Sequence, residues 1–251
     1  MIMKGLLERM GRCSFLFLAL IILLVTVFLP LIGVLLRLRF SLPFLISLPP
    51  YFLMISLLYR GRRREAVYLM LFWAFLLGAV MSLLVYFLPE KTAVSIINGP
   101  PYRDEMFYWV KTGIGKEGTP SLFIPEHLIH LGVFLLLSLV SASFLAIALG
   151  AVLVDYMAFY VGSLLLHSRS FALTFLLGWH FWSLIRIVAY VILGVVLAEP
   201  LLSRILRYPF RLRDVKWYLL IAGICLIADI LLKALFAPSL RSVLLRLVIL
   251  P

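Results

Sequence analysis

The stretch that decides the fold runs from His127 to Leu166 and reads HLIHLGVFLLLSLVSASFLAIALGAVLVDYMAFYVGSLLL. As one α-helix rising about 1.5 Å per residue it would be about 60 Å long, which is twice the ~30 Å hydrocarbon thickness of a bilayer. The stretch therefore forms either a hairpin of two membrane spans or one span with a protruding end. Gly150 provides a turn for the hairpin.

The composition of the whole chain agrees with a membrane protein. Of its 251 residues 65% are hydrophobic and 14% are charged, and the mean hydropathy is +1.15. A soluble domain is about half apolar and about one quarter charged, so this chain has more apolar surface than a soluble core can bury. Because only helices and closed barrels satisfy the backbone in hydrocarbon, the long apolar stretches predict helices. We expect an all-α, polytopic transmembrane helical bundle that forms one integral membrane domain over residues 1–251.

The apolar stretches outside this block complete a set of seven predicted spans. A polar segment at 89–125 is long enough to fold outside the membrane, and the tail at 238–251 carries Arg241 and Arg246 among leucines and valines, as in an interfacial amphipathic helix. The predicted spans are about 14–36, 40–59, 66–88, 129–147, 149–166, 171–198 and 217–237.

The basic residues predict the orientation. They form three clusters at 4–12, 60–64 and 204–216, and the hairpin interpretation places all three on one side of the membrane. Cytoplasmic loops are enriched in Lys and Arg, so we expect the N-terminus in the cytoplasm, the 89–125 loop outside, and a location in the cell membrane. The formal net charge of +12 then reflects topology and lipid head groups, and it does not indicate a nucleic-acid partner because the chain has no soluble basic domain.

Polar residues within the predicted spans point to one candidate site near the outer face. Glu126, His127 and His130 lie at the outer end of the fourth span, and His180 and Asp229 fall at about the same depth as each other, roughly 14 Å below the outer face. Imidazole and carboxylate groups are ligands for zinc and similar ions and also serve as acids and bases. We therefore expect Glu126, His180 and Asp229 to be catalytic, and His127, His130 and His180 to be ligands of a divalent metal such as zinc.

Other interpretations of these histidines remain open at this stage. His127 and His130 are also explained as interfacial residues that bind water, and His180 as a packed ring between Trp179 and Trp182. Haem ligation between helices is a further use of paired histidines. The sequence offers no spacing that selects haem.

Two more buried charges lie in the inner half of the predicted bundle. Asp155 and Arg186 each fall about 8–9 Å from the cytoplasmic edge when depth is counted along their spans. An isolated charge at this depth is costly, so we expect the two to form an intramembrane ion pair. A gate or a site for anionic head groups is the alternative.

These features leave three hypotheses for function. The first is a membrane-embedded enzyme that acts on a lipid or another membrane-borne substrate at the outer site. The second is a small transporter or channel, which would need a polar route and broken helices, and Pro49 and Pro50 offer one break. The third is a noncatalytic subunit or assembly factor with membrane-protein partners or a second copy of the chain.

The amide content of the chain carries a separate prediction. The single asparagine, Asn98, and the absence of glutamine predict a thermophilic source.

Overall fold

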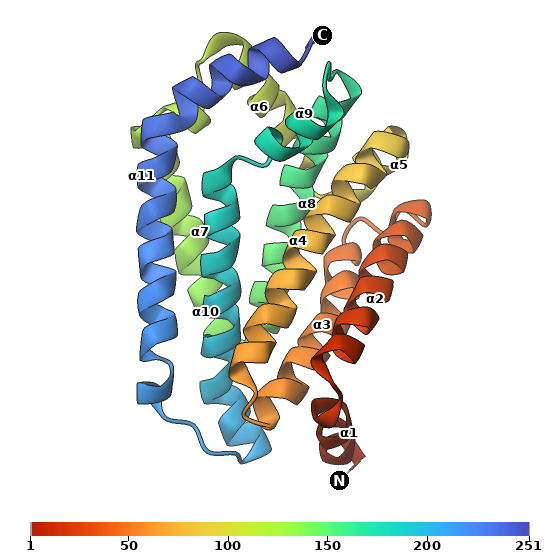
Figure 1. Cartoon of the computed structure of the whole chain (residues 1–251), viewed down its shortest axis with the longest axis vertical. Coiled ribbons are helices and arrows are strands. Elements are labelled where there is room, and N and C mark those ends of the chain that lie inside the picture. The colour runs from red at the N-terminus through yellow and green to blue at the C-terminus, as the bar shows by residue number, and fades with distance from the viewer. Residues whose placement is uncertain (1, 251) are drawn as a thin grey trace.

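The computed structural model describes residues 2–250, and the chain in this range folds into helices joined by short connections (Figure 1). Seven of the helices are long and apolar enough to cross a membrane, which confirms the predicted all-α bundle of seven spans. The helices are α1 (Ile2–Arg12), α2 (Phe15–Leu35), α3 (Leu42–Tyr59), α4 (Arg63–Phe87), α5 (Pro89–Ser95), α6 (Gly99–Thr112), α7 (Pro120–Val140), α8 (Phe144–Leu166), α9 (Phe171–Gly178), α10 (Phe181–Leu206) and α11 (Lys216–Leu247), with short 3₁₀ turns η1 (Lys116–Gly118) and η2 (Leu212–Asp214).

Successive spans alternate in direction, so the two termini lie at opposite ends of the bundle (Figure 1). The N-terminal end carries α1 and the connections at 60–62 and 207–215, which hold the basic clusters. The C-terminal end carries α5, α6 and α9, and α11 bends across it (Figure 1). The bend is consistent with Pro238 inside α11, because proline lacks the N–H that continues the helical ladder.

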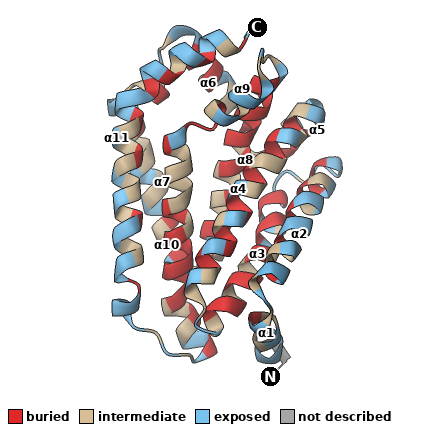
Figure 2. Cartoon of the chain, in the orientation of Figure 1, coloured by how far each residue is buried: buried red, intermediate tan, exposed pale blue. Residues whose placement is uncertain are grey.

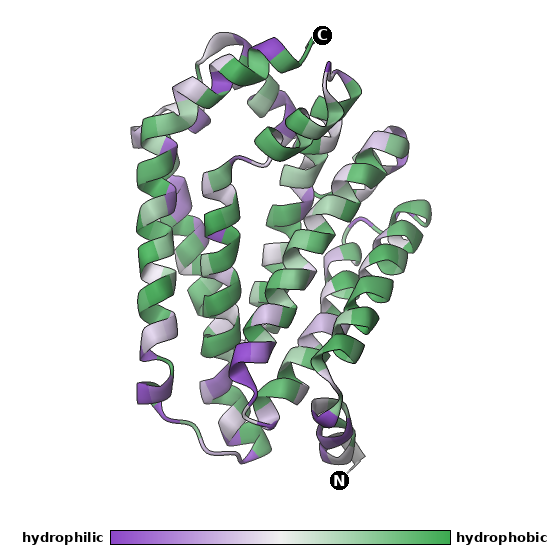
Figure 3. Cartoon of the chain, viewed as in Figure 1, coloured by the Kyte–Doolittle hydropathy of each residue, from purple (hydrophilic) through white to green (hydrophobic). Residues whose placement is uncertain are grey.

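The core of the bundle lies around α4 and α8. In α8 the backbone approaches α4 closely at Gly162, where an added Cβ would lie 2.5 Å from the Ser82 carbonyl oxygen. Outer helices bury little, because only 22% of the most apolar window of α2 and 17% of those of α7 and α11 is buried. Figure 2 shows this contrast, and Figure 3 shows that the exposed faces are largely hydrophobic. Such faces suit contact with lipid.

The hairpin in the 127–166 stretch forms, but its turn lies elsewhere than predicted. The turn is at Ser141–Ala142–Ser143, where Ala142 and Ser143 have positive φ angles of 49° and 68°. The Ser141 hydroxyl accepts a hydrogen bond from the Leu145 N–H and so caps the start of α8. Gly150 lies inside α8, so the predicted boundary at 148 is wrong by about two turns of helix.

The predicted span at 171–198 is in fact two helices. α9 ends at Gly178, and α10 begins at Phe181 after a sharp reversal at His180, whose φ is +46°. The Trp179 ring packs on Gly78 of α4, where a Cβ would lie 2.7 Å from the ring. This anchor accounts for a break that hydropathy cannot reveal, since both helices are apolar.

The remaining predicted segments are ordered as parts of the bundle. The 89–125 segment folds into α5, α6, η1 and the first residues of α7. The 238–251 tail continues α11 up to Leu247, after which Ile249 N–H donates to the His167 carbonyl at 2.9 Å. α3 stays helical through Pro49 and Pro50, so the break expected there is absent from this helix.

Candidate functional site

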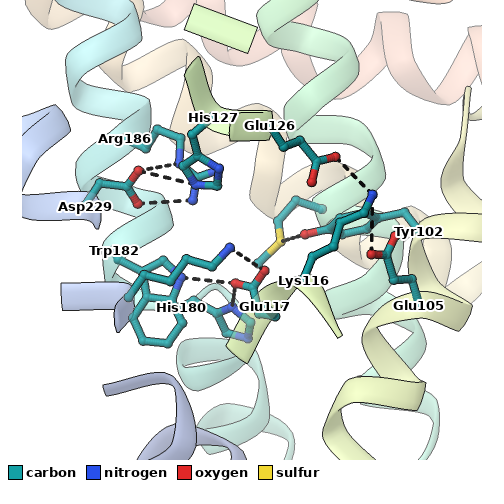
Figure 4. A network of polar contacts seen from close by, with 12 residues as sticks. Tyr102, Glu105, Lys116, Glu117, Glu126, His127, His180, Trp182, Arg186 and Asp229 are labelled. Atoms are coloured by element: carbon teal, nitrogen blue, oxygen red, sulfur yellow. Dashed lines mark hydrogen bonds and ion pairs between the residues drawn. The ribbon is translucent and has the colours of Figure 1, made fainter. Parts of the chain in front are cut away.

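The first polar group of the site joins α7, α10 and α11 (Figure 4). Arg186 donates two hydrogen bonds to Asp229, from Nε at 2.8 Å and from Nη2 at 3.1 Å. His127 Nε2 lies 3.7 Å from Asp229 Oδ2, and neither ring nitrogen of His127 has a hydrogen-bond partner among the described residues. A buried charge pair of this kind needs near-ideal geometry, and the bidentate contact provides it.

This geometry corrects the predicted Asp155–Arg186 pair. Arg186 is near the start of α10, because the apolar residues before it belong to α9, so it lies toward the C-terminal end of the bundle beside Asp229. Depth counted along one long span therefore placed it in the wrong half. Asp155 is 2% exposed, and its Oδ1 has no hydrogen-bond partner in residues 2–250.

A second polar group is centred on Glu117 of η1, whose side chain contacts Trp182 of α10 and Lys233 of α11 (Figure 4). Its Oε2 accepts a hydrogen bond from Lys233 Nζ at 2.7 Å, and its Oε1 accepts one from Trp182 Nε1 at 3.3 Å. His180 Nδ1 lies 3.4 Å from Oε1, and its Nε2 lies 3.4 Å from the Tyr160 hydroxyl. The loop therefore contributes a buried carboxylate that joins α10 and α11.

The Glu117 carboxyl is held in its ionised form. Burial by itself raises the pKa of a carboxyl group, but the neighbouring Lys233 ammonium and His180 ring hold the pKa of Glu117 well below its ordinary value of 4.5. Lys233 is 3% exposed in its side chain and also lies over the Phe123 ring at 4.5 Å. The Glu117 carboxylate and the Lys233 ammonium therefore compensate each other's charge in the buried interior.

Neither member of this pair was among the predicted site residues. Lys233 was detectable in principle, since a lysine within a predicted span needs a partner. Glu117 gave no comparable signal, because a carboxylate in a polar loop is expected to be solvated. Its burial follows from the path of the loop, which the sequence does not show.

A third polar group lies closer to the surface. Lys116 Nζ lies 3.3 Å from Glu126 Oε1 and 3.5 Å from Glu105 Oε1, so it links α6 to the start of α7 (Figure 4). These side chains are 40–49% exposed. Salt bridges with this exposure contribute little to stability, and their importance lies in the charge that they place at the site.

A cavity of about 230 Å³ lies among α4, α6, α7, α8 and α10 and reaches all three groups. Toward the C-terminal end of the bundle its lining is polar, with Tyr102, Glu105, Lys116, Glu117, Glu126, His127, His130, Arg186 and Lys233. Deeper in the bundle its lining is largely apolar, with Met70, Trp73, Ala74, Leu77, Phe134, Ile147, Ala151, Val154, Ile187 and Val191. The cavity is therefore amphipathic along its length.

The structure brings together part of the predicted site. Glu126, His127 and His130 line the cavity, and Asp229 lies behind Arg186 at its polar end. His180 is outside the lining, because it caps α10 and faces Glu117 and Tyr160. Residues 2–250 contain no group of three His, Cys, Asp or Glu side chains placed to hold a metal ion, so the predicted site formed by His127, His130 and His180 has no support in the structure.

No known protein family, curated protein or solved structure matches this chain. Seven apolar helices long enough to cross a membrane place it among multi-pass helical membrane proteins. Any narrower description must come from the cavity itself.

Proposed function

We propose that the protein is a membrane-embedded enzyme that acts on an amphipathic, membrane-borne substrate. The observation that carries this proposal is the cavity, whose apolar part lies between α4, α8 and α10 and whose polar part holds the ionic groups. A lipid-like molecule matches both parts, because its chain can occupy the apolar depth while its head group meets the polar end. The positive-inside distribution supports a cytoplasmic N-terminus and an outward-facing polar end in the cell membrane.

His127 is the group best placed for proton transfer within this cavity. Its ring lines the cavity, its nitrogens are free of hydrogen bonds to other described residues, and Asp229 stands 3.7 Å behind Nε2. Because neither ring nitrogen is committed to another residue, one can accept a proton from a bound substrate while the other donates, and the nearby Asp229 carboxylate adds negative charge beside Nε2. In this proposal Asp229 positions His127, Glu126 is a second acid–base group at the mouth, and His180 holds Glu117 in place.

A transporter has less support from the structure. The deep part of the cavity is apolar, so it offers no polar route through the bundle. The break expected at Pro49 and Pro50 does not occur, and the break between α9 and α10 lies at the polar end of the cavity. Across the bundle, Arg63 and Glu199 pair with each other near the N-terminal end. A noncatalytic subunit would be marked by exposed apolar faces, which contact with lipid already explains.

Two matched glycine variants test whether the cavity binds a lipid. Gly150 lines the cavity and an added Cβ would have its nearest neighbour at 4.0 Å, so Gly150→Leu fills cavity space. Gly132 lies outside the lining, and its Cβ would meet nothing within 4 Å, so Gly132→Leu is the control. Lipids extracted from the purified proteins should include a species that is retained by Gly132→Leu and lost from Gly150→Leu. Equal lipid content in both variants contradicts the proposal.

Catalysis is tested with a total lipid extract of the expression host. Wild-type protein should convert a component of this extract, as followed by liquid chromatography and mass spectrometry, while His127→Gln should leave it unchanged. The lipid species retained by wild-type protein should also be retained by His127→Gln, because glutamine keeps a polar side chain of similar size. Unchanged lipid with both proteins contradicts the enzymatic part of the proposal.

A further inference from the structure

The charges at the polar end of the cavity restrict the head group that it can take. Three cations line this end, and each is already paired with a carboxylate. Arg186 is bound by Asp229 through two hydrogen bonds, and Lys233 is bound by Glu117 at 2.7 Å. No cation in this lining is free of a carboxylate partner.

The pairing also leaves an excess of negative charge. Lys116 is shared by Glu105 and Glu126, at 3.5 Å and 3.3 Å, so with neutral histidines the four carboxylates exceed the three cations by one. Sites that bind phosphate normally offer free guanidinium, ammonium or backbone N–H groups. A phosphate here would be buried beside carboxylates, and like charges repel strongly where water is excluded.

Uncharged hydrogen-bonding groups, in contrast, are available in the same lining. Neither the Tyr156 hydroxyl nor the Tyr190 hydroxyl forms a hydrogen bond with another described residue, although both tyrosines line the cavity. The His127 ring is likewise without a partner. Such groups donate to and accept from hydroxyls without a change in charge. A ligand that hydrogen-bonds to the His127 nitrogens is favoured, since an unpaired buried polar group is costly.

We infer that the site takes a lipid whose head group is uncharged and rich in hydroxyls, and that it discriminates against lipids whose head group is a phosphate. This inference rests on the proposed function, because it assumes that the cavity is the substrate site. It adds the substrate class, namely glycosylated glycerolipids rather than lipids with a phosphate head group. The exclusion comes from the charge balance and not from the size of the cavity.

Native mass spectrometry with two probes of identical acyl chains tests the inference. The probes are dioleoyl glucosylglycerol and dioleoyl phosphatidate, and binding to the cavity is the part that Gly150→Leu removes and Gly132→Leu retains. We expect cavity binding of the glucoside to be at least about tenfold tighter, equivalent to about 1.4 kcal/mol. Equal or tighter cavity binding of the phosphatidate overturns the inference while leaving the proposed function in place. If neither probe shows cavity binding, the proposed function fails and this inference fails with it.

A variant with altered charge tests whether the charge balance of the lining causes the discrimination against phosphate. Glu105→Gln combined with Glu126→Gln removes two carboxylates and turns the excess of one negative charge into an excess of one positive charge. The ratio of phosphatidate binding to glucoside binding in the cavity should then increase about tenfold or more. Glu90→Gln, an exposed carboxylate on α5 outside this lining, is the control and should leave this ratio unchanged. An unchanged ratio in the double variant refutes the electrostatic cause.

Discussion

At the scale of single residues, Glu117 and Lys233 form a buried ion pair in which each charge needs the other. Both side chains are nearly fully buried and 2.7 Å apart, so removal of one leaves the other as an uncompensated charge. Glu117→Gln should lower the free energy of unfolding by about 3 kcal/mol, because breaking a buried pair costs far more than the pair contributes. Unfolding of the purified protein in mixed detergent and dodecyl sulfate micelles measures this.

The double variant Glu117→Gln with Lys233→Met separates the pair from the packing around it. It removes both charges, so it should recover most of the stability that Glu117→Gln loses. A double variant as unstable as the sum of the two single variants would show that the two residues do not interact.

The same carboxylate gives the protein a predicted pH dependence. Because the pKa of Glu117 is lower in the folded protein than its ordinary value of 4.5, its contribution to stability is complete above pH 4.5 and is lost as the pH falls toward the folded pKa. The stability difference between wild-type protein and Glu117→Gln should therefore be constant from pH 5 to 7 and shrink at about pH 3. Unfolding midpoints of both proteins across this range give the answer, and a constant difference down to pH 3 contradicts the prediction.

Asp155 and Asp229 provide a direct test of the corrected ion pair. Asp229→Asn removes the partner of Arg186, whose side chain is 23% exposed, so it should destabilise the protein by about 3 kcal/mol. Asp155→Asn removes a carboxyl with no ionic partner in the described residues and should leave stability unchanged or raised. If the same unfolding assay shows that Asp155→Asn is more destabilising than Asp229→Asn, the result favours a pair between Asp155 and Arg186 and contradicts the corrected pair.

At the scale of elements, the number of spans could be predicted from the sequence, whereas the ends of several could not. Hydropathy and length fix the count, because each helix must cover about 30 Å of hydrocarbon. They give no signal at His180, where two apolar helices meet, or at 141–143, where small residues form a turn. Because residues 171–198 were predicted as one span, Arg186 was expected at the wrong depth and His180 was expected inside a span.

The contact between α4 and α8 carries its own prediction. A Cβ on Gly162 would lie 2.5 Å from both the Ser82 carbonyl oxygen and Val85 Cβ, so Gly162→Ala must push the two helices apart. We expect it to destabilise the protein by about 1–3 kcal/mol. Gly132→Ala has open space around it and should instead stabilise α7 by up to about 1 kcal/mol, as alanine does elsewhere in helices. Similar effects of the two variants on unfolding would contradict the close approach.

At the scale of the whole molecule, charge divides between the two ends of the bundle. The N-terminal end carries basic residues that are mostly exposed, while the C-terminal end carries ionic groups that are mostly paired around the cavity. The candidate cavity residues Glu126, His127 and His130 could be predicted from the sequence, because they are polar residues at the start of an apolar helix. Glu117 could not, since only the folded path of the 89–125 segment brings it into contact with α10 and α11.

This division predicts how the protein sits in the membrane. Basic connections are retained in the cytoplasm during insertion, so the N-terminal end should face the cytoplasm and the cavity mouth should face outward. Cysteines at exposed Arg213, in the connection before α11, and at exposed Lys91, on α5, report on the two ends. In a background with Cys13 and Cys225 replaced by serine, a membrane-impermeant maleimide applied to intact cells should label Lys91→Cys and not Arg213→Cys. Both should react after the membrane is permeabilised. Labelling of Arg213→Cys alone in intact cells would invert the topology, and the cavity would then receive its substrate from the cytoplasmic leaflet.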